Sequence, residues 1–192
     1  MCHFLNLPGE LRNYIYSFII YPHQERIAFA SATDPKDLVS TLLRSPIYRT
    51  NRQIRAEALS YLCKSKTFTA INFRTAGILL EWTGPYGRAG LADMKLLLTY
   101  WDSSEDGIRE SKQVVELLKD AKALRQLHLE FVPGFQLNMV TPAQWDVLGM
   151  MKHAISEEGV FVWGIWGTRR YEWATIPEQV QVVLGRENAV TM

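Results

Sequence analysis

His128 and Glu130 come nearest to a reactive site in residue type and spacing. They stand two apart on one face of a predicted strand and could share a metal ion. No HxxxH or HExxH spacing supplies a further ligand, and Cys63 has no neighbouring base in the sequence. A histidine on the polar face of a sheet is the simpler interpretation. The sequence therefore predicts no catalytic residue, no metal site and no cofactor.

Three arginines form a second candidate site. Arg49, Arg52 and Arg55 are spaced by three within a predicted helix over residues 47–62, so they share one stripe of that helix. A row of guanidinium groups could bind phosphates or an acidic partner. The alternative is a solvated face in which these arginines pair with Glu57 and similar carboxylates.

A third candidate site follows from the predicted sheet. Trp101, Asp102 and Trp166 lie near the carboxyl ends of predicted strands, where open parallel sheets bind ligands. An aromatic pocket there would suit a small molecule. Arg169 and Arg170 stand among aromatic residues, as in surfaces that bind single-stranded nucleic acid. The net charge of +1 argues against a nucleic-acid partner.

The composition is that of a globular domain. The chain has 192 residues, of which 47% are hydrophobic and 21% are charged. Cys2 and Cys63 are its only cysteines, which excludes a cysteine-rich zinc site and argues against a disulfide framework. No basic region with a long apolar run opens the sequence, and no run approaches the length of a membrane span. These features predict a cytoplasmic or nuclear protein with no membrane partner.

The N-terminal third is predicted to be helical, apart from a short strand at 26–30. Its first helix opens at Leu7, with Asn6 as the cap and Pro8 in the first turn. Helical spacing predicts a buried face on it, made of Leu11, Tyr14, Ile15, Phe18 and Ile19. Two more helices are predicted over 34–45 and 47–62. We expect one cluster to unite Leu11, Ile15, Phe18, Ile54 and Leu59.

Strands and helices alternate from residue 67 onward. The predicted strands cover 67–73, 94–101, 124–131 and 160–166, and the second is expected to be buried on both faces. Helices are predicted at 76–82 and 108–121 and from Thr141 onward, with an irregular loop over 84–90. The alternation predicts an α/β or α+β fold with a mainly parallel sheet of about four strands, 94–101 beside 124–131. A few degenerate solenoid-type repeats would give the same alternation.

Further elements and boundaries complete the predicted organisation. A hairpin partner is expected at 169–173, and Thr175 with Glu178 predicts a last short helix. We expect a helical segment over 1–66, an α/β region over 67–184 that forms one compact unit with it, and a loose tail over 185–192.

Two motifs in the N-terminal third occur in the order found in F-box proteins. Leu7, Pro8, Glu10, Leu11 and Ile15 match the pattern LPxE(I/L)xxxI. The later stretches 42–43 and 50–59, with Tyr61 and the Thr67-Phe68 strand, are similar to the second part of the motif. Residues 4–73 thus resemble the F-box-like segment of fungal proteins. The resemblance implies that Leu7, Pro8, Leu11 and Ile15 bind the Skp-type adaptor of an SCF-type ubiquitin ligase, while the α/β region recognises a target.

Three classes of function remain open at this level. The first is a non-enzymatic protein-interaction module, as the resemblance implies. The second is a small-molecule-binding or enzymatic domain with its pocket at the carboxyl ends of the strands, and the third is a nucleic-acid binder. An exposed apolar patch on the first helices would favour the first class, a deep aromatic pocket the second, and a continuous basic groove the third.

Overall fold

The computed structural model describes residues 4–29, 44–98, 100–131, 140–154 and 160–165. The elements, in chain order, are η1 (Phe4–Asn6), α1 (Gly9–Ile19), β1 (Arg26–Phe29), η2 (Pro46–Arg49), α3 (Arg52–Ser65), β2 (Thr67–Ala70), α4 (Phe73–Gly90), β3 (Asp93–Leu98), α5 (Glu105–Leu118), β4 (Gln126–Phe131), α6 (Pro142–Ala154) and β5 (Val160–Ile165). No helix in this part of the chain is long and apolar enough to cross a membrane.

The sheet has five strands in the order β1-β2-β3-β4-β5, and every neighbouring pair is parallel. The predicted α/β class is confirmed, and so is the parallel pairing of β3 with β4, in which Leu96 lies opposite Leu129. The sheet has one strand more than the four expected from residue 67 onward. The additional strand is β1, which the N-terminal third contributes to the edge beside β2.

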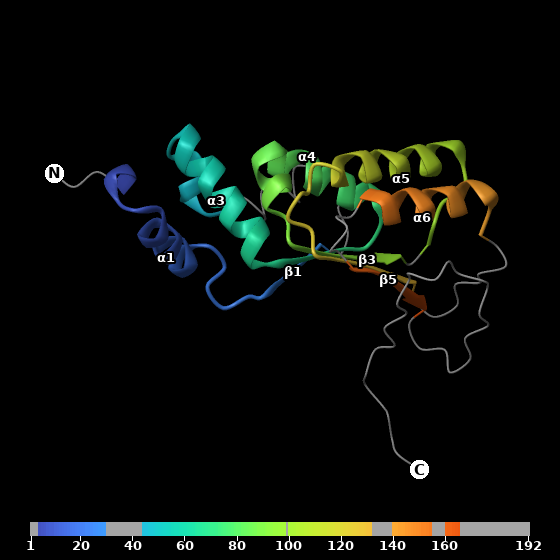
Figure 1. The fold of residues 1–192 in the computed structure, drawn as a ribbon, viewed down its shortest axis with the longest axis horizontal. Helices are drawn as coiled ribbons and strands as arrows, with labels where there is room; N and C mark the ends of the chain where they lie inside the picture. The colour runs from blue at the N-terminus through green and yellow to red at the C-terminus, as the bar shows by residue number, and fades with distance from the viewer. Residues whose placement is uncertain (1–3, 30–43, 99, 132–139, 155–159, 166–192) are drawn as a thin grey trace, which may run out of the picture.

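The long helices that the structure describes after β1 lie along the same side of the sheet. Figure 1 shows α3, α4, α5 and α6 in a row above the strands. A consecutive strand order joined by crossovers of one hand produces this arrangement, because each crossover then returns over the same face. Each strand–helix unit therefore packs against the units before and after it in the sequence. Solenoid repeats, which the sequence also allowed, stack in the same way.

The core lies between this helical layer and the sheet. The strand residues that alternate toward the helices are buried: Ile27, Phe29, Phe68, Ala70, Met94, Leu96, Leu98, Leu127, Leu129 and Phe131. Val114, Val115 and Leu118 of α5 meet them from the helical side. The expectation that the second predicted strand is buried on both faces was wrong, because Asp93, Lys95 and Leu97 alternate toward the other face and are only half-buried.

Side-chain caps define where most of the helices begin. Asn51, Asn72 and Ser104 accept backbone hydrogen bonds at the starts of α3, α4 and α5. The capping box predicted at α6 is confirmed: Thr141 N donates to Gln144 Oε1 at 2.8 Å, and Gln144 N donates to Thr141 Oγ1 at 3.3 Å.

The segment 84–90, predicted to be an irregular loop, belongs to α4. Gly84 has φ 64° and ψ −178°, which kinks the helix, and Pro85 then opens a second helical run that ends at Gly90. The prediction failed because it treated glycine and proline as breakers of the helix, whereas they redirect it. Glycine is also required at residue 90, since a Cβ there would lie 2.9 Å from the carbonyl oxygen of Ser60.

Two predicted helix starts are also corrected. α1 begins after Pro8 and has no side-chain cap, so Asn6 does not cap it. The predicted helix over 47–62 is η2 followed by α3, because the Asn51 side chain accepts from Ile54 N at 2.8 Å and starts a new helix there. Apart from residues 44 and 45, the predicted helix over 34–45 lies outside the described residues. So do the hairpin partner at 169–173, the last short helix and the tail.

Candidate partner-binding site

Helix α1 faces the rest of the molecule with one side and solvent with the other. Tyr16 and the adjoining Ile20 are fully buried. On the opposite side, Leu11 is 50% exposed, Tyr14 63% and Phe18 60%. Tyr14 and Phe18 pack edge to face with 4.8 Å between their ring centroids. The apolar residues of α1 therefore form an outer surface.

The predicted burial of this helix was wrong. Leu11 and Phe18 do not join the core, whereas Leu59 is buried in it and Ile54 packs against it. The prediction chose the face with the most apolar residues, but Tyr16 inserts from the other face, near the rings of Phe4 and Tyr61. We call the apolar residues on the outer side the α1 stripe. It consists of Leu11, Tyr14, Ile15 and Phe18 of the helix, with Leu7 and Pro8 just before it.

The four residues to which the resemblance assigns adaptor binding all belong to the α1 stripe. Leu11 and Ile15 are four residues apart in α1, so they lie one above the other on the helix, and Leu7 and Pro8 precede its first turn. Pro8 and Leu11 are exposed, while Leu7 and Ile15 are half-buried. Exposed apolar area gathered on one helix face is a common feature of protein-binding surfaces.

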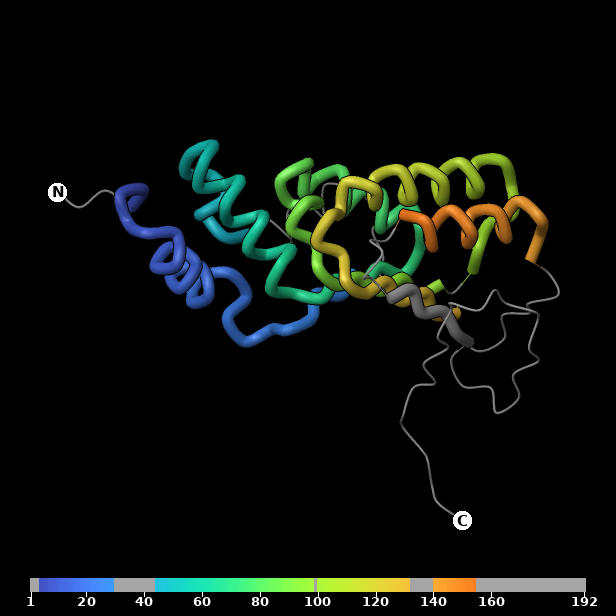
Figure 2. The backbone as a smooth tube through the Cα atoms, viewed as in Figure 1, coloured from blue at the N-terminus to red at the C-terminus, as the bar shows by residue number. Residues whose placement is uncertain are grey.

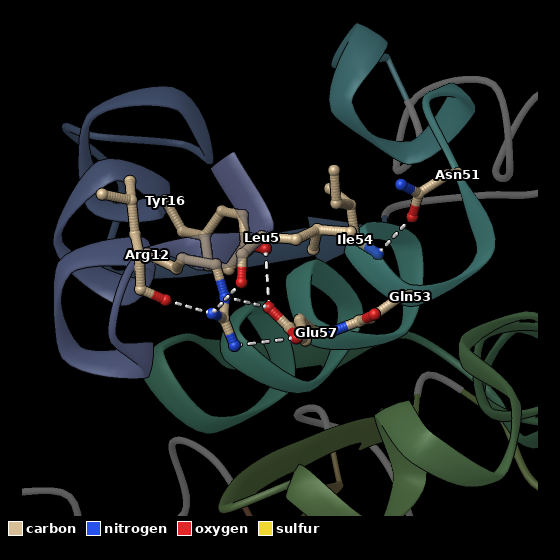
Figure 3. Close-up of polar contacts among 8 residues, drawn as sticks. Leu5, Arg12, Tyr16, Asn51, Gln53, Ile54 and Glu57 are labelled. Carbon is tan, nitrogen blue, oxygen red and sulfur yellow. Dashed lines mark hydrogen bonds and ion pairs between the residues drawn. The ribbon is translucent and has the colours of Figure 1, made fainter. Parts of the chain in front are cut away.

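A polar joint attaches α1 to α3, which lies beside it (Figure 2). Arg12 Nε donates to Glu57 Oε2 at 2.7 Å, and Arg12 Nη2 donates to Glu57 Oε1 at 3.0 Å (Figure 3). Arg12 Nη1 donates to the carbonyl oxygens of Leu5 and Leu7. The guanidinium group thus connects α3 to the chain that leads into α1 and sets the position of the α1 stripe.

Glu57 is the centre of this joint. It also accepts from Gln53 Nε2 at 3.0 Å and from the Tyr16 hydroxyl at 3.1 Å. Burial raises the pKa of Glu57, but the hydrogen bonds from Arg12, Gln53 and Tyr16 outweigh that effect and lower it overall. Burial and the bond to Glu57 raise the pKa of Tyr16 to about 12. The joint therefore holds an ionised carboxylate at neutral pH.

The three arginines do not lie in one continuous helix. Arg49 lies in η2, while Arg52 and Arg55 lie in the first turn of α3, and all three are exposed. Glu57, the partner expected for them, binds Arg12 instead. The helix break at Asn51, which no spacing of three reveals, separates Arg49 from the other two.

A groove of about 990 Å³ lies beside the polar joint. It is lined by residues of α1, α3 and the second run of α4: Gly9, Arg12, Asn13, Arg52, Gln53, Ala56, Glu57, Ser60, Tyr61, Lys64 and Tyr86. Sequence reasoning missed it, because the groove depends on how three separate helices pack. A signal was present in α3, where the lining residues repeat at intervals of three and four along one face.

Two of the residues predicted to line a pocket at the carboxyl ends of the strands, Trp101 and Asp102, make contacts within the fold. Trp101 is only 4% exposed and packs against Phe73 and Phe131, with centroid distances of 5.1 and 6.0 Å. Asp102 Oδ1 accepts from Ser104 N at 2.9 Å, and this backbone bond lowers the pKa of its carboxyl group. The two residues fill space and shape the entry to α5. Trp166 lies outside the described residues.

His128, Glu130 and Cys63, the residues considered for metal binding or nucleophilic chemistry, interact with neighbouring side chains or are buried in the core. His128 Nε2 lies 3.2 Å from Gln126 Oε1, Glu130 pairs with Lys95 at 2.7 Å, and burial lowers the pKa of His128. No group of three metal-ligating side chains occurs within the described ranges. Cys63 is buried, which raises the pKa of its thiol to about 12 and disfavours the reactive thiolate.

Comparisons with family models, with curated proteins and with solved structures found no match to this chain.

Proposed function

We propose that this protein is a protein-interaction module that docks a partner through the α1 stripe, and that the partner is the Skp-type adaptor of an SCF-type ubiquitin ligase. The observation that supports the proposal is the outward orientation of the α1 stripe. A helix that served only as part of the core would turn Leu11, Tyr14 and Phe18 inward. Here their exposed fractions are 50%, 63% and 60%.

The polar joint supports the same proposal. Because Arg12, Glu57 and the buried Tyr16 attach α1 from its inner side, the helix keeps a defined position without using Leu11, Tyr14 or Phe18. A docking surface held in place in advance loses less conformational entropy when the partner binds. The choice of adaptor rests on the resemblance of Leu7, Pro8, Leu11 and Ile15 to the F-box pattern.

Gel filtration of the purified protein with the Skp-type adaptor tests the proposal. At tens of micromolar of each, corresponding to a binding free energy of about −6 kcal/mol, we expect a complex. The double variant with Leu7→Ala and Pro8→Ala should not form it, since a few apolar residues dominate such interfaces. Absence of any complex with the unaltered chain would contradict the adaptor assignment.

A matched pair of tyrosines tests whether binding is specific to the α1 stripe or occurs at any exposed aromatic residue. Tyr14 lies in the α1 stripe and is 63% exposed, whereas Tyr100, beyond β3, is 68% exposed. We expect Tyr14→Ala to weaken adaptor binding and Tyr100→Ala to leave it unchanged. Equal weakening by both variants would show that the adaptor does not select α1.

A further inference from the structure

Two positive charges lie at opposite ends of the groove formed by α1, α3 and α4. Arg52 is the first residue of α3, and Lys64 is the last but one. Both are exposed, and no ion pair to either occurs within the described residues. The other charges of the lining, Arg12 and Glu57, neutralise each other. The groove therefore carries a net charge of about +2.

The spacing of these charges indicates an extended ligand. Arg52 and Lys64 are twelve residues apart in one helix, a rise of about 18 Å. One phosphate or carboxylate cannot reach both, because charge-assisted hydrogen bonds are about 2.7–2.9 Å long. An extended peptide would span the distance with about five or six residues.

The surface between the two charges is suited to a peptide. Asn13 and Ser60 provide neutral hydrogen-bonding groups of the kind that pair with peptide amides. Ala56 has a small side chain that permits close approach, and Tyr61 and Tyr86 provide aromatic surface. Tyr86 is 69% exposed and reaches the groove because the α4 kink at Gly84 redirects residues 85–90.

We propose that this groove binds an extended acidic peptide segment of a partner protein, with Arg52 and Lys64 holding carboxylates at its two ends. The inference is independent of the adaptor proposal, because the groove uses Gly9, Arg12 and Asn13 on the side of α1 opposite the α1 stripe. A nucleic acid fits less well, since its phosphates are densely spaced, whereas Arg52 and Lys64 are separated by about 18 Å along α3.

Fluorescence anisotropy with a labelled decapeptide of alternating glutamate and serine tests the proposal. This probe offers carboxylates at several separations along an extended chain. We expect this peptide to bind and its affinity to fall as the salt concentration is raised. A peptide with glutamine in place of glutamate should bind more weakly. Equal binding of the glutamate and glutamine peptides, or no binding of the glutamate peptide, would overturn the proposal.

Arg55 supplies the matched control for Arg52, since both are exposed arginines in the first turn of α3 and only Arg52 lines the groove. We expect Arg52→Ala and Lys64→Ala each to lower the affinity for the acidic peptide about threefold. Arg55→Ala should leave that affinity unchanged. The variants with Leu7→Ala and Pro8→Ala should bind the peptide normally. Equal losses at residues 52 and 55, or tighter binding of a single-stranded oligonucleotide than of the peptide, would reject the acidic-peptide site.

Discussion

The α/β layer and the corner formed by α1 and α3 are built in opposite ways. In the layer, apolar residues such as Leu96 and Leu129 are inside, and ion pairs such as Lys95–Glu130 are on the outer face of the sheet. In the corner, the Arg12–Glu57 ion pair lies at the contact between the helices, while Leu11 and Phe18 lie outside. Burial of apolar area stabilises the layer. The corner leaves apolar area uncovered, as a surface for a partner would.

The largest effect is expected in the layer. Leu129 is fully buried in the middle of β4. Leu129→Ala removes its apolar contacts and leaves a cavity, so we expect the free energy of unfolding to fall by about 2–5 kcal/mol. Chemical denaturation measures this loss. A fall below about 1 kcal/mol would mean that the sheet does not provide the main core.

A local effect is expected at the polar joint. Glu57→Ala removes the acceptor shared by Arg12, Tyr16 and Gln53 and leaves their donors without it. We expect faster hydrogen exchange in α1 and unchanged exchange in β3 and β4.

Gln53→Ala is the control for this experiment, because it removes only one exposed donor to Glu57. It should change exchange in α1 less than Glu57→Ala does. Equal acceleration in α1 and in the central strands would show that corner and layer unfold together, which would remove the distinction between them.

The joint should also respond to acid. The pKa of Glu57 is lowered from 4.5 in the folded protein, so its stabilising effect is complete above 4.5 and is lost as the pH falls through the lowered value. We expect exchange in α1, corrected for the intrinsic effect of pH, to rise as the pH falls below 4.5 and through the lowered pKa of Glu57. Glu57→Gln should lack this dependence. An identical pH profile in that variant would assign the effect to other carboxylates.

The smallest effect on stability is expected at the α1 stripe. Phe18 is 60% exposed, so Phe18→Ala should change the free energy of unfolding by less than about 0.5 kcal/mol. Chemical denaturation of Phe18→Ala and Leu129→Ala under the same conditions compares the loss of unfolding free energy for one large apolar residue in each region. A loss above about 2 kcal/mol would show that Phe18 is part of the core in solution.

The pattern of apolar residues predicted the layer well. Two observations were sufficient: alternation along the strands, and connections too long for hairpins between 94–101 and 124–131. The Thr141–Gln144 capping box was equally local, since both partners lie within one helical turn. The kink at Gly84 was missed, because glycine and proline can either end a helix or redirect it, and their types alone do not distinguish the two outcomes.

By itself, the sequence determined the class of fold, the parallel pairing and the apolar spacing along α1, because these depend on periodicities within single segments. Only the tertiary structure decided which face of α1 is buried, how deeply Trp101 is buried, and which arginine lines the groove. Each outcome depends on a residue distant in sequence. Glu57 binds Arg12 of α1, Phe131 packs against Trp101, and Tyr86 lines the same groove as Arg52. A helical pattern reveals that a face is apolar, but only the neighbouring elements determine whether that face is covered.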